Sequence, residues 1–253
     1  MHPFKYIITS YFKVRIIKKL LCKENVDTLL DIGCGGGFMI SQLINCFKKA
    51  IGVDMSKEAI EFAKKFSNHS FLVGDAQNLK FESNKFDCVI SVDSFEHFPD
   101  DKKVINEVYR VLKKNGTLII YTPCNEGLLA NTKSAGLYHS DKNSFMIDYR
   151  YYDKKSLEKL CKDSKFIVEN ISYHNIFIQE FLTQILKLFS SIFKKKYDNQ
   201  SDIYNFTSSL FYYFYKLLFP IIFLLVRAEE FIFEKFFFGK IKGHRLVVKC
   251  RKA

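Results

Sequence analysis

The sequence lacks the patterns that identify disulfide-rich, zinc-binding and exported proteins. Its seven cysteines, at positions 22, 34, 46, 88, 124, 161 and 250, form no CxxC pair and no cluster with histidine. An odd, scattered set predicts reduced thiols inside a cell, with neither a disulfide framework nor a structural zinc site. Lysine and arginine interrupt the apolar residues at the start of the chain, so we expect no secretory signal.

Acidic residues are scarce towards both ends. Residues 1–25 carry six basic residues and one acidic residue, residues 26–175 carry twenty of each sign, and residues 176–253 carry thirteen basic and six acidic residues. The net charge of +12 therefore flanks a neutral middle. Such ends suit an anionic surface, either membrane headgroups or nucleic acid, although a Lys-, Ile- and Phe-rich genome would also produce this composition.

Neither an internal repeat nor a low-complexity linker interrupts the 253 residues, which favours one domain. We expect a basic N-terminal helix at 1–25, a cofactor-binding core at 26–174, a hydrophobic helical insertion at 175–243 and a final strand at 244–253. In the core, short apolar runs alternate with amphipathic stretches, which predicts a parallel sheet covered by helices. The expected strands are Asp27–Ile32, Ala50–Asp54, Ser70–Val73, Phe86–Ser91, Thr117–Thr122, Phe166–Tyr173 and His244–Arg251, and the expected helices are Phe38–Phe47, Lys57–Ser67, Asp101–Lys113 and Lys154–Lys162.

Residues 175–243 are much more apolar than the rest. Apolar residues recur at helical spacing from Ile178 to Phe193, and after a basic break Leu210–Val226 contains one charged residue, Lys216. A single membrane crossing would separate the last strand from its sheet. An even number of crossings and a re-entrant hairpin remain open, and we expect helices lying on a membrane surface. A pocket cap, a homodimer interface and a partner-docking site are the alternatives.

Glycines cluster at Gly33, Gly35, Gly36 and Gly37, where a strand is expected to pass into a helix. Glycine allows the backbone to turn tightly and to approach a ligand closely. Asp54 ends the following strand, the position of a carboxylate that binds ribose hydroxyls. A dinucleotide loop of the form GxGxxG would need glycine at position 38, where the chain has phenylalanine, so the pattern favours a different adenosyl ligand.

Five segments in order resemble the motif series of class I methyltransferases: LDIGCGGG, IGVDMS, FLVGDAQNL, FDCVISVDSFEHFPD and VLKKNGTLIIYTP. The resemblance covers about residues 26–174 and extends to the type 11 group, which includes ubiquinone and menaquinone methyltransferases. It implies an α/β fold with a doubly wound, Rossmann-like, seven-stranded sheet whose last strand is antiparallel. It also implies S-adenosyl-L-methionine as the cofactor.

The same resemblance implies the residues of the cofactor site. Asp31 and the glycine loop would face the methionine amino and carboxylate groups, and Asp54 would accept hydrogen bonds from the ribose hydroxyls. Met55 would pack on the adenine, Asp75 would accept from its amino group, and the Ala76 N–H would donate to the ring. The implied cofactor-binding residues are Asp31, Gly33, Gly35, Gly37, Asp54, Met55, Asp75, Ala76 and Ser91.

The run after the fourth strand provides the catalytic candidates. His97 is the first choice of base for a hydroxyl acceptor, because imidazole titrates near neutrality, and Glu96 is its partner, although a structural role is an equal alternative. In quinone-type O-methyltransferases an ExxEH run is associated with a divalent metal. Here Asp93 replaces the first glutamate, so Asp93, Glu96 and His97 form a weaker candidate site for Mg²⁺. Further acceptor-side candidates are Tyr121, Pro123, Asn125, Tyr138, His139, Tyr149, Arg150 and Tyr151.

These observations predict a cytoplasmic methyltransferase, peripheral to the inner face of the membrane, that acts on a lipid-like or lipid-linked small molecule at oxygen or carbon. A soluble methyltransferase whose insertion shapes the pocket or forms a dimer is the alternative. An RNA methyltransferase or nucleic-acid binder is disfavoured, because the neutral core places no basic groove beside the cofactor site and no NPPY-type signature follows the fourth strand. The sequence does not predict the oligomeric state.

Overall fold

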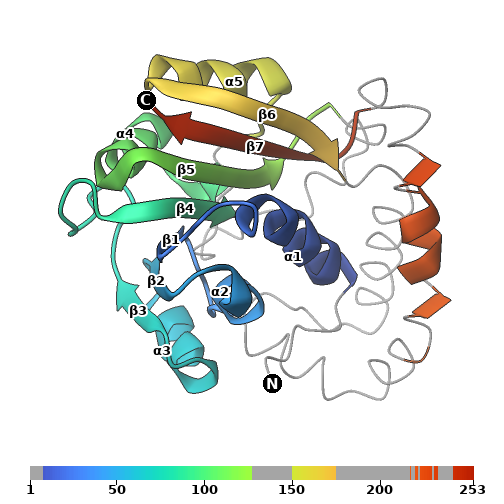
Figure 1. Ribbon diagram of the computed structural model, residues 1–253, viewed down its shortest axis with the longest axis horizontal. Helices are drawn as coiled ribbons and strands as arrows, with labels where there is room; N and C mark the ends of the chain where they lie inside the picture. Colours follow the sequence, from blue (N-terminus) through green and yellow to red (C-terminus); the bar gives the residue numbers. More distant parts are fainter. Residues whose placement is uncertain are drawn as a thin grey trace.

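The computed structural model describes residues 8–126, 150–174, 217, 220–221, 223–229, 231–232 and 242–253 (Figure 1). These residues form a seven-stranded sheet in the order β3-β2-β1-β4-β5-β7-β6. Strands β1 to β5 pair in parallel, and β7 is antiparallel to both β5 and β6, which confirms the predicted fold class. The strands are β1 (Thr28–Ile32), β2 (Lys49–Asp54), β3 (Ser70–Val73), β4 (Phe86–Val92), β5 (Leu112–Pro123), β6 (Phe166–His174) and β7 (Arg245–Lys252).

Helices cover both faces of this sheet (Figure 1). One apolar layer joins α1, α2 and α3 to the side chains that β1, β4 and β5 direct to that face, and the other joins α4 and α5 to the opposite side chains. Alternation along each strand supplies both layers, as in Leu29 and Leu30, which are fully buried on opposite faces. The helices are α1 (Ile8–Leu21), α2 (Phe38–Gln42), α3 (Lys57–Phe66), α4 (Asp101–Val111) and α5 (Lys154–Asp163), with short 3-10 turns η2 (Ile44–Cys46) and η3 (Phe95–His97).

Two expected helices are shorter than predicted. The stretch expected to be helical to Phe47 ends at Gln42, because the Leu43 N–H is shared between the carbonyls of Met39 and Ile40 and a 3-10 turn follows. The helix expected to reach Lys113 ends at Val111, because Leu112 is extended and pairs with Phe86 at the start of β5. Apolar periodicity continues through both breaks, so it could not locate them.

The strand order places a topological switch point between β1 and β4. From β1 the chain proceeds outward through β2 to β3, and it then returns to the other side of β1 to form β4 and β5. Ligands of open α/β sheets bind at the carboxyl ends of the strands that flank such a point. The glycine loop follows β1 and the Asp93–His97 segment follows β4, so the fold brings the two predicted halves of the site to one edge.

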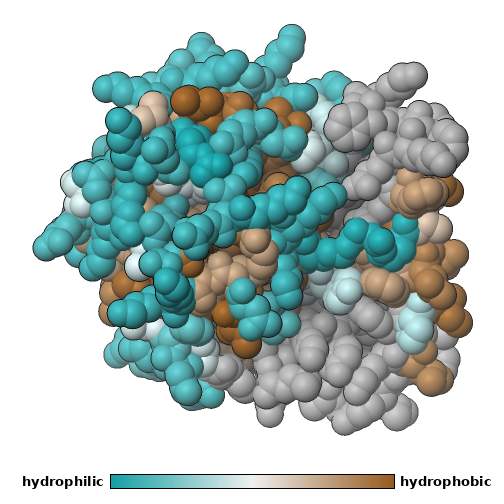
Figure 2. Space-filling view, in the orientation of Figure 1, coloured by the Kyte–Doolittle hydropathy of each residue, from teal (hydrophilic) through white to brown (hydrophobic). Residues whose placement is uncertain are grey.

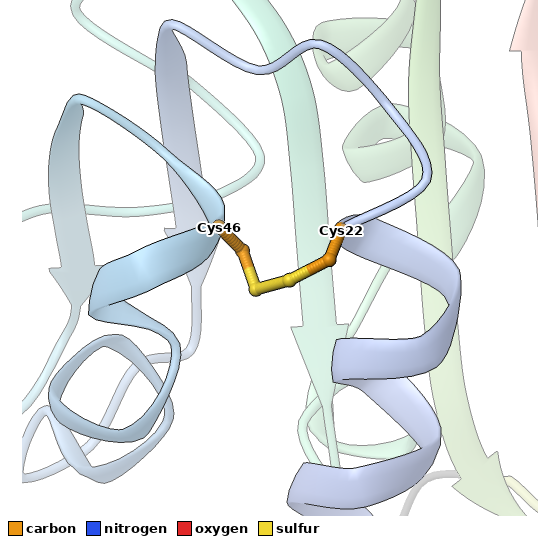
Figure 3. Close-up of a disulfide and its surroundings, with 2 residues drawn as sticks. All are labelled: Cys22 and Cys46. Carbon is orange, nitrogen blue, oxygen red and sulfur yellow. A yellow bond between two sulfur atoms is a disulfide. The ribbon is translucent and has the colours of Figure 1, made fainter.

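The cysteines correct one expectation. Cys22, just after α1, and Cys46, at the end of η2, form a disulfide 24 residues apart in the chain (Figure 3). The expectation of reduced thiols is therefore wrong for this pair. The described free cysteines, at 34, 88, 124, 161 and 250, are buried. The pairing depends on α1 packing beside α2, which cysteine spacing does not reveal.

Most of the predicted insertion lies outside the described residues, including Ile178–Phe193. Described residues between 217 and 232 are helical, and Phe223 packs against Tyr11 and Phe12 of α1, with ring centroids 5.2 and 5.9 Å away. The outward side of this helix is apolar, as Figure 2 shows at the right edge. Its exposed apolar residues are Leu217, Ile221, Leu224, Leu225, Phe231 and Ile232. Within the described residues, no helix has the length and apolar character needed to cross a membrane.

Candidate functional site

The glycine loop folds back over the end of β2. The N–H groups of Gly33 and Cys34 both donate to the Val53 carbonyl, at 2.8 and 3.1 Å. Gly33 has a φ of 68°, in the left-handed region, and a methyl group there would overlap the Ser94 side chain. Glycine is therefore required at position 33 both for its backbone conformation and for the close approach of the segment after β4.

Asp31 is a buried carboxylate with an unsatisfied oxygen. Its side chain is 1% exposed and its Oδ2 atom has no hydrogen-bond partner. Burial, together with the nearby Asp54 carboxylate, raises the pKa of Asp31 well above its ordinary value. Because an unpaired buried carboxylate is costly, its presence at the sheet edge indicates a site for a cationic ligand group.

Asp54 connects the glycine loop to the next helix. Its Oδ2 accepts from the Gly35 N–H at 2.8 Å and its Oδ1 accepts from the Ser56 N–H at 2.9 Å. Each carboxylate oxygen can accept a second hydrogen bond, so this arrangement still leaves room for two hydroxyl donors. Met55 beside it is 65% exposed, which leaves an apolar side chain available to a ligand.

Asp75 and Ala76 follow β3 at the same edge. The half-buried Asp75 carboxylate accepts from the backbone N–H of Gln77 at 2.8 Å and from its side-chain amide at 3.2 Å. The Gly74 N–H donates to the Asp54 carbonyl, which holds this turn against the end of β2. The predicted adenine-binding residues therefore lie next to the predicted ribose-binding residue.

Ser91 is fully buried and holds the ends of β1 and β4 together. Its hydroxyl is 2.7 Å from that of Ser94, and Ser94 donates to the Ile32 carbonyl at 2.9 Å. The structure thus brings all nine predicted cofactor residues to the carboxyl ends of β1 to β4. Their individual roles toward a cofactor remain predictions. Ser94, which the sequence analysis did not select, shapes the loop by contacting both Ile32 and Gly33.

Glu96 and His97 lie at the end of β4, in η3. The Glu96 side chain is 2% exposed, accepts from the Thr122 hydroxyl at 3.0 Å and lies 4.0 Å from the imidazole Nε2 of His97. Burial and the nearby Asp93 carboxylate raise the pKa of Glu96 to about 7, while His97 acts in the opposite direction. A carboxyl group that titrates near neutrality beside an imidazole can take part in proton transfer.

Asp93 has cationic partners that the sequence analysis missed. The ammonium group of Lys13, in α1, donates to Asp93 Oδ2, and Arg245 Nε of β7 is 3.7 Å from Asp93 Oδ1. Although burial opposes it, these cations hold the pKa of Asp93 below its ordinary value. Lys13 and Arg245 lie 80 and 152 positions from Asp93, so no local pattern could have identified them.

The Mg²⁺ hypothesis for Asp93, Glu96 and His97 is not supported. Asp93 is engaged by an ammonium and a guanidinium group, and Glu96 accepts from a buried hydroxyl. The part of the chain that the structure describes contains no group of three or more such side chains that could hold a metal ion. The shortened side chain at position 93 is used for an ion pair instead.

The remaining acceptor-side candidates separate into core residues and supporting residues. Tyr121 is 1% exposed and belongs to the core, whereas Arg150 donates to the carbonyls of Phe98 and Pro99 and so supports the segment after η3. Tyr138, His139 and Tyr149 lie outside the described residues.

Comparison with known proteins identifies similar methyltransferases. A family model described as a methyltransferase domain matches residues 30–120. A ubiquinone biosynthesis O-methyltransferase from Pelagibacter ubique is 33% identical over 48% of this chain and 55% of its own length, and a demethylmenaquinone methyltransferase from Thermotoga maritima is 34% identical over 46% and 51%. The chain spans about half the length of these curated relatives.

A solved structure shares the fold. Phosphoethanolamine N-methyltransferase 2 from Haemonchus contortus, in complex with S-adenosyl-L-methionine, aligns over 96% of this chain and 52% of its own, with a TM-score of 0.59 and 22% identity. With the switch-point site, these matches define the class: the chain contains a class I S-adenosylmethionine-dependent methyltransferase domain. Within that class, residues 30–120 match the model of the type 11 methyltransferase group.

Proposed function

We propose that the protein transfers the methyl group of S-adenosylmethionine to oxygen or carbon of a lipid-like or lipid-linked small molecule at a membrane surface. One observation carries this proposal. Consecutive residues of α1 contact both the helix with the exposed apolar face and the acceptor end of the site: Tyr11 and Phe12 pack on Phe223, and Lys13 binds Asp93. An apolar surface beside the acceptor site suits an acceptor that is delivered from a membrane.

The site residues fit the cofactor. The unpaired Oδ2 of Asp31 matches the cationic amino group, and Asp54 presents oxygens for the ribose hydroxyls. When bound, the cofactor supplies a methyl group on a positively charged sulfur. Positioning of the acceptor in line with the C–S bond then accounts for most of the catalysis, up to roughly 7–11 kcal/mol.

Glu96 and His97 provide the proton acceptor. For a hydroxyl acceptor, the O–H proton passes to His97 as the new C–O bond forms and the C–S bond breaks, and the sulfur leaves as a neutral thioether. Base assistance of this kind contributes typically about 10²–10⁴-fold. Glu96, 4.0 Å from the imidazole, stabilises the imidazolium that forms.

The charged and apolar residues of this surface suit binding to an anionic membrane. Lys18 and Lys19 are exposed on α1, beside a helix that exposes Ile221, Leu224 and Leu225. Basic residues near an anionic leaflet contribute about 1 kcal/mol each. The inner, cytoplasmic face is the proposed location. Disulfides are uncommon in reducing compartments, so the Cys22–Cys46 disulfide is an observation against this location. Alkylation of Cys22 in intact cells decides between them: a reactive, reduced Cys22 supports the cytoplasmic face, and an oxidised Cys22 overturns it.

The acceptor is tested by incubating the protein with labelled S-adenosylmethionine and either membrane lipid extract or soluble metabolites. We expect label in the lipid fraction, and no label with the Asp54→Ala variant, which lacks the proposed ribose contact. Label that enters only soluble metabolites would overturn the lipid assignment and favour the soluble alternative.

The surface is tested by flotation with phosphatidylcholine vesicles, with and without phosphatidylglycerol. Ile221→Glu combined with Leu224→Glu should abolish flotation, because both side chains are exposed, at 60% and 65%. Ile167→Glu is the matched control, since Ile167 is 56% exposed but lies on β6. Equal flotation of all variants would exclude this helix as the membrane contact, and a dimer disrupted by the double substitution would identify a homodimer interface.

A further inference from the structure

The ion pair between Lys13 and Asp93 occupies the position that the sequence assigned to a divalent metal. The carboxylate follows β4, at the carboxyl edge of the sheet, and Asp93 has a φ of 49°, an uncommon conformation for a residue other than glycine. Its N–H donates to the Tyr121 carbonyl at 2.8 Å, which fixes the backbone against β5. The carboxylate is therefore held in one place, where Lys13 meets it.

Lys13 is equally well fixed. Its side chain is 21% exposed and its ammonium lies 5.8 Å from the centroid of the Tyr121 ring, a cation–π geometry. The neighbouring residues Phe12, Ile16 and Ile17 are buried, so the register of α1 on the sheet determines where the ammonium group lies. A long side chain restrained in this way holds its ammonium group at a fixed position in the structure.

The charges around the pair are contributed by separate elements. Lys13 from α1, Arg245 from β7 and His97 from η3 face Asp93, and Asp93, His97 and Arg245 face Glu96. Without Lys13, the buried carboxyl groups of Asp93 and Glu96 would have fewer cationic groups near them. Breaking one member of a buried pair leaves an uncompensated charge, which is strongly unfavourable.

We propose that Lys13 is a positioning residue of the transfer site and supplies at Asp93 the positive charge that a divalent metal would otherwise provide. The proposal rests on the proposed function above. Lys13 keeps Asp93 in place, and Asp93 begins the segment whose Ser94 contacts Ile32 and Gly33 and whose Glu96 and His97 receive the acceptor proton. Two consequences follow: transfer needs no divalent metal, and it depends on an α1 residue that touches neither the cofactor nor the acceptor.

The experiment compares the wild-type protein with Lys13→Ala, Lys13→Arg and the control Lys64→Ala, an exposed lysine of α3. With the membrane lipid extract as acceptor, EDTA should leave wild-type transfer unchanged. Lys13→Ala should lower kcat about 10²-fold, the scale of one proton-transfer or electrostatic contribution, with little change in the KM for S-adenosylmethionine. Lys13→Arg should restore most of the rate, and Lys64→Ala should match the wild type.

A purely structural role would be recognised by a raised KM for S-adenosylmethionine in Lys13→Ala, without recovery of the rate in Lys13→Arg, and that result would overturn the proposal. So would loss of wild-type transfer in EDTA, or a full kcat in Lys13→Ala. A second measurement needs no acceptor: electron paramagnetic resonance of Mn²⁺ added to the wild-type protein should show no bound ion. Bound Mn²⁺ that Asp93→Asn removes would overturn the inference, whereas failure to methylate any lipid would contradict only the proposed function.

Discussion

The two edges of the sheet differ in how their charged groups are paired. At the carboxyl edge, Asp31 has an unpaired oxygen and Glu96 has a pKa raised to about 7. At the opposite, amino edge, Glu24 binds both Lys249 and Arg251, Glu169 binds the same two cations at 3.1 and 2.7 Å, and the pKa of Glu24 is lowered to about 2.

This difference in pairing distinguishes charged groups that stabilise the fold from charged groups that are available to a ligand. A network whose members are all paired stabilises the folded chain and offers little to a ligand. An unpaired or protonated carboxyl group costs stability and is retained where a ligand or a proton will meet it. The amino edge, which also contains the Cys22–Cys46 disulfide, should therefore respond to mutation through stability, and the carboxyl edge through binding and catalysis.

The largest expected effect is at the amino edge. Reduction of the disulfide, which closes a 24-residue separation, should lower the free energy of unfolding by about 3 kcal/mol on the chain-entropy estimate. Denaturant unfolding with and without a phosphine reductant measures this change, and calorimetry should show unchanged affinity for S-adenosylmethionine. The Cys22→Ser, Cys46→Ser double variant should not respond to reductant. A large loss of cofactor affinity on reduction would contradict the assignment of stability to the amino edge and of binding to the carboxyl edge.

At the carboxyl edge, Asp31→Asn should act in opposite directions on affinity and stability. Loss of one charged hydrogen bond, about 1.5–3 kcal/mol, weakens cofactor binding by roughly 10- to 150-fold. The melting temperature of the free protein should rise, because a buried unpaired carboxylate is replaced by a neutral group. Calorimetric titration and thermal unfolding measure the two effects, with the exposed Asp163→Asn as control. Unchanged affinity would exclude Asp31 from the cofactor site.

Glu24→Gln should lower the free energy of unfolding at neutral pH by roughly 1–3 kcal/mol, without changing cofactor affinity. The pKa of Glu24 is about 2 in the folded protein against an ordinary value of 4.5, so its stabilisation is complete above about pH 4.5 and is lost as the pH falls towards 2. The difference between variant and wild type should therefore disappear in acid. Unfolding curves across this pH range measure the difference, and the exposed Glu82→Gln variant is the control. A difference that persisted in acid would contradict the lowered pKa of Glu24.

For Glu96→Gln we expect the opposite dependence on pH. Between its ordinary value of 4.5 and the folded value of about 7, the unfolded chain releases the proton first, so the wild-type protein loses stability as the pH rises. The variant should equal the wild type near pH 4 and exceed it by up to about 3 kcal/mol above pH 7. Thermal unfolding against pH measures this. A constant difference would show that Glu96 is not protonated in the folded state.

Much of the fold was predictable because its signals are local. Apolar alternation located every strand of the sheet to within a few residues, apart from the start of β5, and the motif order placed Asp31, Asp54 and Asp75 at the ends of successive strands. Local signals did not reveal where α2 ends, since the apolar pattern continues through Leu43. They also gave the wrong state for Cys22 and Cys46, because only the packing of α1 beside α2 brings these residues together.

The sequence by itself therefore determined the class of the domain and predicted which residues lie at the carboxyl ends of β1 to β4, because glycines, carboxylates and strand ends lie close together along the chain. Tertiary structure alone decided which charged side chains surround Asp93. Lys13 arrives from α1 and Arg245 from β7, and they converge on Asp93 only because the last strand inserts between β5 and β6 and α1 packs across the sheet. Contacts between such distant residues depend on the packing of whole elements, which no local pattern records.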